Sequence, residues 1–82
     1  MKEIKLQEVL TKEQWDMREK IAEFGNDEGT HSESVCFVYD FGFMLTVSDI
    51  RIPTEFFKIT KAEFMEWMQR FYEDRMEYTE EG

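Results

Sequence analysis

The single histidine, His31, lies in a segment that also carries Asp27, Glu28 and Glu33. Imidazole and carboxylate groups could together hold a metal ion, but calcium loops need their oxygen ligands at a fixed spacing that residues 27–31 lack. No nucleophile stands near His31 in the sequence for it to activate as a general base. The sequence therefore predicts a solvated loop here, with no metal site.

The single cysteine, Cys36, stands within the apolar stretch Val35–Tyr39. A reactive thiolate needs an electropositive, partly exposed setting, and no Lys or Arg occurs between Lys20 and Arg51. We therefore expect Cys36 to be a small buried apolar side chain. Asp40-Phe41-Gly42 spells the magnesium-binding tripeptide of protein kinases, but the chain lacks the other kinase signatures, so we interpret it as a hairpin turn. These observations predict no catalytic residue and no cofactor.

A strongly acidic surface is expected on the last helical segment. Its polar face carries Glu63, Glu66, Glu73, Asp74 and Glu77, with Arg70 as its basic residue. Such a face is either solvated helix surface or a docking surface for a basic partner. Trp67 and Tyr78 lie at the edge of the apolar arc, where they pack inside the domain or contact another molecule. Together these seven acidic and aromatic residues form the candidate partner-binding surface.

Two helices should position these groups. Thr11 to Gln14 fits a capping box, and Met17, Ile21 and Phe24 follow at helical spacing, which predicts a helix over 12–24 ending at Gly25. Thr60 to Glu63 is a second capping box and begins a helix over 61–78. The apolar arc of the second helix spans about half of its circumference, more than packing on one sheet requires.

The segment between the helices should form a sheet. The residue types predict strands over 35–39 and 43–47, joined by the Asp40-Phe41-Gly42 turn, with Val35 and Phe37 sharing a face with Phe43 and Leu45. Residues 50–52 are a third strand or a continuation that Pro53 ends, and 56–59 are a short strand or turn. Residues 1–10 fit an edge strand or a helix, and we favour the strand. The predicted fold is one α+β domain over 1–82, with an antiparallel sheet of three to four strands, two helices on one face and the order (β)αβββα.

Length and charge narrow the class further. The chain has 82 residues, 10 Lys and Arg, 19 Asp and Glu, and a formal net charge of −9. This balance argues against direct binding of nucleic acid or of an anionic membrane. No apolar run has the length of a membrane span, and a lone cysteine favours a reducing compartment, so we expect a cytoplasmic protein.

The expected function is therefore that of a non-enzymatic binding protein that docks on a basic protein surface. In length, charge and lack of catalytic motifs, the chain resembles the small acidic antagonists that phages and mobile elements make against host nucleic-acid-binding enzymes, including CRISPR effectors. That resemblance implies a nucleic-acid mimic acting as an inhibitor, and it assigns no residue roles. The alternative is a structural module that forms a homodimer through the broad apolar face of the C-terminal helix.

Overall fold

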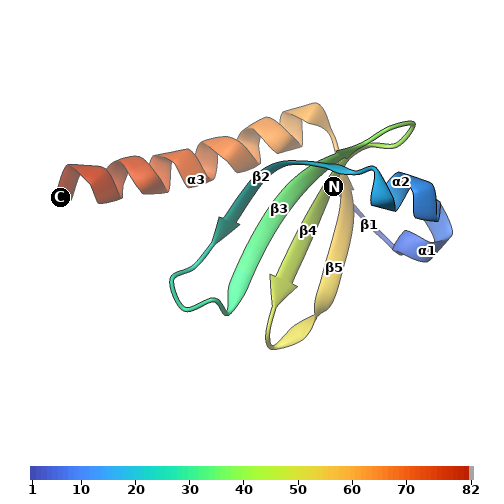
Figure 1. Cartoon of the computed structure of the whole chain (residues 1–82). Coiled ribbons are helices and arrows are strands. Elements are labelled where there is room, and N and C mark those ends of the chain that lie inside the picture. Colours follow the sequence, from blue (N-terminus) through green and yellow to red (C-terminus); the bar gives the residue numbers. More distant parts are fainter. Residues whose placement is uncertain (82) are drawn as a thin grey trace.

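The protein is an α+β fold built on one antiparallel sheet (Figure 1). The computed structural model describes the backbone of residues 1–81 and the side chains of residues 1–71. The strands are β1 (Lys2–Ile4), β2 (Glu19–Gly25), β3 (His31–Val38), β4 (Gly42–Asp49) and β5 (Ile52–Ile59), and the helices are α1 (Leu6–Val9), α2 (Lys12–Asp16) and α3 (Lys61–Glu81). The predicted class and antiparallel pairing are confirmed. The predicted counts were too low, because the described residues form five strands and three helices.

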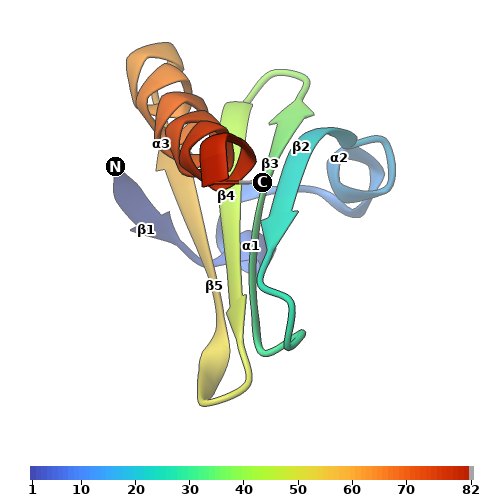
Figure 2. The same ribbon diagram turned by 90° about the vertical axis from the view of Figure 1, so that its left-hand side faces the viewer.

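The strand order explains how the chain covers both faces of the sheet. Across the sheet the order is β1-β5-β4-β3-β2, so consecutive strands β1 and β2 lie at opposite edges. The segment that carries α1 and α2 connects them across one face, while α3 lies on the other (Figures 1 and 2). The prediction that both helical segments cover the same face was therefore wrong.

The predicted helix over 12–24 is replaced by a short helix and a strand. Thr11 does form the expected capping box with Gln14, but α2 ends at Asp16. Residues 19–25 instead form β2, in which Ala22 pairs with Val35 and Phe24 with Glu33. The spacing of the apolar residues in this segment fits a helix and also a strand that places positions 22 and 24 on one face. Pairing with β3 satisfies the backbone hydrogen bonds of this segment and buries part of Phe24, so the segment forms a strand.

The central hairpin and the C-terminal helix agree closely with the sequence pattern. β3 and β4 pair with Val35 opposite Leu45 and Phe37 opposite Phe43, so these residues share a face as predicted. Gly42 takes a positive φ of 112°, but it begins β4 opposite Val38. The turn therefore spans residues 39–41, with Asp40 at a φ of 57°, and not the predicted Asp40-Phe41-Gly42. α3 begins at the Thr60 capping box, where Thr60 and Glu63 exchange backbone-to-side-chain hydrogen bonds of 2.9 and 3.1 Å.

Pro53 lies inside β5 and does not end a strand, contrary to the prediction. β1 covers only the part of β5 from Phe56 to Lys58. Proline lacks a backbone N–H, so it is tolerated where the neighbouring strand does not require one. At the N-terminus, the favoured strand is confirmed over Lys2–Ile4, whereas the residues from Leu6 to Val9 form α1.

The core lies between α3 and the sheet. Its buried members are Val35, Leu45, Ile59 and Trp67, surrounded by half-buried aromatic residues that include Phe43, Phe64 and Phe71. The opposite face of the sheet buries Cys36, Val38 and Met44. The crossing segment covers that face, where Gln14 Nε2 donates to the Tyr39 carbonyl at 2.9 Å and the Trp15 ring meets the edge of Phe56.

Candidate functional site

The acidic flank of α3 borders a groove over the β5 half of the sheet. The groove has a volume of about 370 Å³ and is lined by Glu63, Glu66 and Arg70 of α3, by the buried residues Leu45, Ile59 and Trp67, and by Met1. The Met1 ammonium group pairs with the Glu63 carboxylate, and this contact lowers the pKa of Glu63, with a further contribution from the Thr60 N–H. Glu66 is exposed and points its charge to solvent.

The position of Trp67 corrects one part of the expected partner-binding surface. Only 4% of this residue is exposed, and it packs against Val35, Leu45 and Ile59 in the core. Its indole therefore fills the interior and is not offered to a partner. Of the other expected residues, Glu63 and Glu66 lie on the acidic flank, while the side chains of Glu73, Asp74, Glu77 and Tyr78 lie outside the described side chains.

The other flank of α3 is apolar and open. Met65 is 58% exposed and Met68 is 40% exposed, although both belong to the arc that the sequence pattern marks as apolar. Phe64, Trp67 and Phe71 carry the contact with the sheet, so this arc is indeed wider than the sheet can cover. Acidic groups border the groove, and methionines occupy the uncovered part of the apolar arc.

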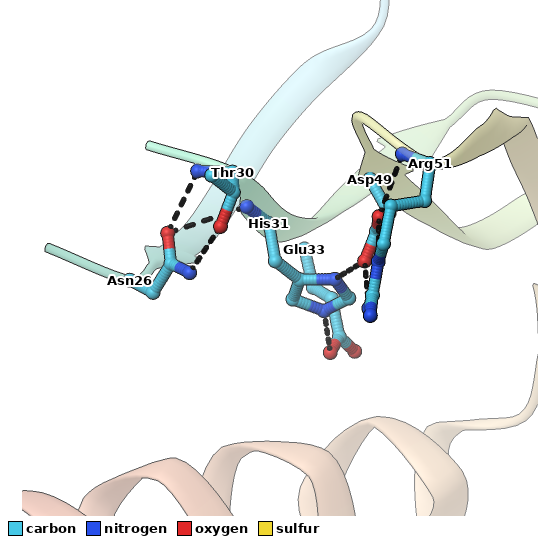
Figure 3. A network of polar contacts seen from close by, with 6 residues as sticks. All are labelled: Asn26, Thr30, His31, Glu33, Asp49 and Arg51. Atoms are coloured by element: carbon cyan, nitrogen blue, oxygen red, sulfur yellow. Dashed lines mark hydrogen bonds and ion pairs between the residues drawn. The ribbon is translucent and has the colours of Figure 1, made fainter. Parts of the chain in front are cut away.

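A cluster of polar side chains lies between α3 and the sheet, at the end of the sheet where β3 begins and β4 ends. The antiparallel register places His31 directly opposite Asp49. Figure 3 shows the His31 ring between two carboxylates, with Arg51 on the far side of Asp49. The predicted solvated loop at His31 is therefore wrong, because this residue begins β3 and is held from both sides.

The distances in this polar group are those of direct hydrogen bonds. His31 Nε2 lies 2.9 Å from Glu33 Oε2, and His31 Nδ1 lies 3.0 Å from Asp49 Oδ2. Arg51 donates from Nε and from a terminal nitrogen to the two oxygens of Asp49, each at 3.0 Å. Trp67 Nε1 of α3 donates to the free oxygen of Glu33 at 3.1 Å. We call Arg51, Asp49, His31, Glu33 and Trp67 the polar chain.

The electrostatics follow from alternating charge along the polar chain. Hydrogen bonds to Glu33 and then to Asp49 raise the pKa of His31 above its usual 6.5. The guanidinium of Arg51, its backbone N–H and then His31 hold the pKa of Asp49 well below its usual range. Both effects favour the charged forms of His31 and Asp49.

The titratable groups of the polar chain are engaged with one another, and the described thiol is buried elsewhere. Both nitrogens of His31 already face carboxylates, and Cys36 lies on the opposite face of the sheet with burial raising the pKa of its thiol. Within the part of the chain with described side chains, no group of three His, Cys, Asp or Glu residues is arranged to hold a metal ion. The contacts among the described side chains of the polar chain are ion pairs and hydrogen bonds.

Charge is divided unequally between the two sides of the sheet. Among residues 1–71, whose side chains the structure describes, the side that carries α3 holds seven acidic residues, which are Glu3, Glu19, Glu33, Asp49, Glu55, Glu63 and Glu66, and three basic ones, which are Arg51, Lys61 and Arg70. The opposite side and its crossing segment hold six basic residues, which are Lys2, Lys5, Lys12, Arg18, Lys20 and Lys58, and four acidic ones, which are Glu8, Glu13, Asp16 and Glu23. Three further carboxylates, Asp27, Glu28 and Asp40, lie in the turns that flank β3, and Asp40, like Glu13 of the crossing segment, is near Tyr39. The molecule is thus electrically polar across its sheet.

Comparisons with protein-family models, with curated proteins and with solved structures found no match. Among the helices in the described residues, none combines the length and the apolar character needed to cross a bilayer.

Proposed function

We propose that this chain is a non-enzymatic acidic binding protein that docks through the α3 side of its sheet on a basic surface of another protein. The observation that carries the proposal is the separation of charge across the sheet. A chain whose excess acidic groups were spread evenly would attract a cationic partner equally in every orientation. One acidic side opposite a slightly basic side instead creates a field that orients the molecule toward a cationic partner.

In its specific form, the partner is a nucleic-acid-binding enzyme and the chain is a nucleic-acid mimic that inhibits it, as an antagonist made by a phage or a mobile element would, including one of the anti-CRISPR kind. A surface evolved to bind phosphates accepts carboxylates at similar positions. The free, buried Cys36 suits a reducing compartment, and we place this function in the cytoplasm.

The test is capture of proteins from a bacterial lysate on the immobilised chain, followed by elution with double-stranded DNA. A mimic occupies the DNA site of its partner, so DNA should release the captured protein, and capture should weaken steeply between about 0.05 and about 0.5 M salt. A captured protein that DNA leaves in place would argue against mimicry, and capture that ignores salt would argue against acidic docking as well.

A matched pair of variants separates the α3 side from total charge. One variant reverses Glu66, Glu73 and Glu77 to Lys, and the other reverses Glu8, Asp16 and Glu28, which are exposed and lie outside α3. Both change the net charge by the same amount. We expect the first to abolish capture, mainly by slowing association, and the second to retain most of it. Equal loss in both variants would show that only net charge matters.

The second candidate function is homodimerisation through α3, which the exposure of Met65 and Met68 favours. Methionine is a frequent residue at adaptable interfaces. Two copies that carry −9 each repel one another, so dimerisation should strengthen as salt rises, opposite to docking on a basic partner. Light scattering across the same salt range distinguishes the two candidates.

A further inference from the structure

The His31 ring is held in a geometry that suits only its protonated form. Each of its nitrogens lies 2.9 or 3.0 Å from a carboxylate oxygen. A carboxylate only accepts hydrogen bonds, and a neutral imidazole donates from one nitrogen alone. Without the second proton, one ring lone pair would face an oxygen at hydrogen-bond distance. The imidazolium donates on both sides and satisfies both contacts.

Glu33 connects this ring to the helix. One carboxylate oxygen accepts from His31 and the other accepts from the indole N–H of Trp67, which is buried at the contact between α3 and the sheet. Asp49 has a second cation in Arg51, whereas among the described contacts the cation at Glu33 is His31. Loss of the His31 charge therefore leaves the Glu33 carboxylate beside Trp67 without its cationic neighbour.

We propose that protonated His31 clasps α3 to the sheet through Glu33 and Trp67, so that the contact of α3 with the sheet loosens as the pH rises and His31 loses its proton. This inference is independent of the proposed docking function, because it applies whatever partner α3 binds. The charged groups around the ring are Glu33 on β3, Asp49 on β4 and Arg51 in the following turn. From α3, the neighbour is the uncharged indole of Trp67, with Arg70 one turn further on.

The direction of the pH effect follows from linkage. The pKa of His31 is raised in the folded protein, so the folded state binds the proton more tightly than the unfolded chain does. The stabilisation is fully present below about pH 6.5 and is lost as the pH rises through the higher value of the folded state. The clasp is thus closed at mildly acidic pH and opens toward alkaline pH.

Proton NMR tests the clasp directly, because His31 is the only histidine and the chain has two tryptophans. In a Trp15→Phe background, the indole N–H resonance belongs to Trp67. We expect the His31 ring proton to titrate with a midpoint above 6.5 and the Trp67 indole proton to shift with the same midpoint. The protection of α3 backbone amides from hydrogen exchange should fall over the same range.

Two variants and one control complete the test. The variant His31→Gln keeps Glu33 but lacks the titrating ring. In this variant the Trp67 indole resonance should no longer shift near neutral pH, and the protection of the α3 amides should no longer fall over that pH range. Glu33→Gln should bring the His31 midpoint down toward 6.5, while Glu28→Gln, an exposed change in the neighbouring loop, should leave both titrations unchanged. A His31 midpoint at or below 6.5, or a Trp67 resonance that ignores the His31 titration, would overturn the proposal.

Discussion

Phe24 of β2 and Phe71 of α3 stack on one another, with ring centroids 4.0 Å apart and an interplanar angle of 27°. Phe71 also meets Trp67 edge-on at 4.7 Å, so the stack continues into the core. β2 is an edge strand, and this contact joins it to the helix that crosses the face of the sheet. The helix therefore helps to hold the edge strand in place. In return, the edge strand fixes α3 to the sheet at Phe71, about halfway along the helix.

Replacing Phe71 by Ala should destabilise the fold by about 2 to 3 kcal/mol, somewhat less than for a fully buried phenylalanine. The loss combines the removed apolar surface with the broken ring stacking. Urea unfolding monitored by tryptophan fluorescence measures it. Met65→Ala, an exposed position on the same helix, is the control and should change stability by less than about 0.5 kcal/mol. Similar effects in the two variants would show that Phe24 and Phe71 do not anchor α3.

Thr60→Ala should cost about 1 kcal/mol of stability, as for other lost N-caps. The hydroxyl of Thr60 accepts from the Glu63 N–H at 3.1 Å, and no other group in the described contacts takes its place. The urea midpoint of this variant should fall, while Thr54→Ala, at an exposed strand position, should leave the midpoint close to that of the parent. An unchanged midpoint for Thr60→Ala would mean that solvent caps α3 equally well.

The sequence predicted correctly those elements whose start is determined by a few neighbouring residues. The Thr60 capping box placed the start of α3, and Gly42 marked the turn between β3 and β4. Residues 19–25 were mistaken for helix because their apolar spacing fits both structures. The choice between them depends on pairing with β3, which a single segment does not contain.

The polar chain was missed for the same reason, although a signal for it was present. The prediction places Val35 and Leu45 on one face of the hairpin, and continuing the observed pairing by four further pairs places His31 opposite Asp49. The predicted strand begins only at Val35, because Ser32, Glu33 and Ser34 before it are polar. They are paired strand residues nonetheless, and Glu33 is held by His31 and Trp67. The burial of Trp67 could not be predicted either, since it depends on where α3 crosses the sheet.

Cys36 should react slowly with a thiol reagent in the folded protein and rapidly in denaturant. Its side chain is 4% exposed, and burial raises the pKa of the thiol, so both access and thiolate formation are suppressed. Labelling with a chromogenic disulfide reagent at pH 8 measures both rates. Rapid labelling of the folded protein would mean that the segment crossing this face of the sheet opens readily.

The stability of the fold should decrease in acid through Asp49 in particular. The pKa of this carboxyl is depressed by Arg51 and His31, so its contribution is fully present above the usual value of about 3.9 and is lost as the pH falls through the lower value of the folded state. Asp49→Asn should therefore be less stable than the parent at pH 7, and the difference should shrink toward pH 2. Urea midpoints measured between pH 7 and pH 2 give both slopes. Asp27→Asn, at an exposed loop carboxyl, should retain the slope of the parent. Parallel pH profiles for Asp49→Asn and the parent would show that the ion pair with Arg51 is too well solvated to stabilise the folded state.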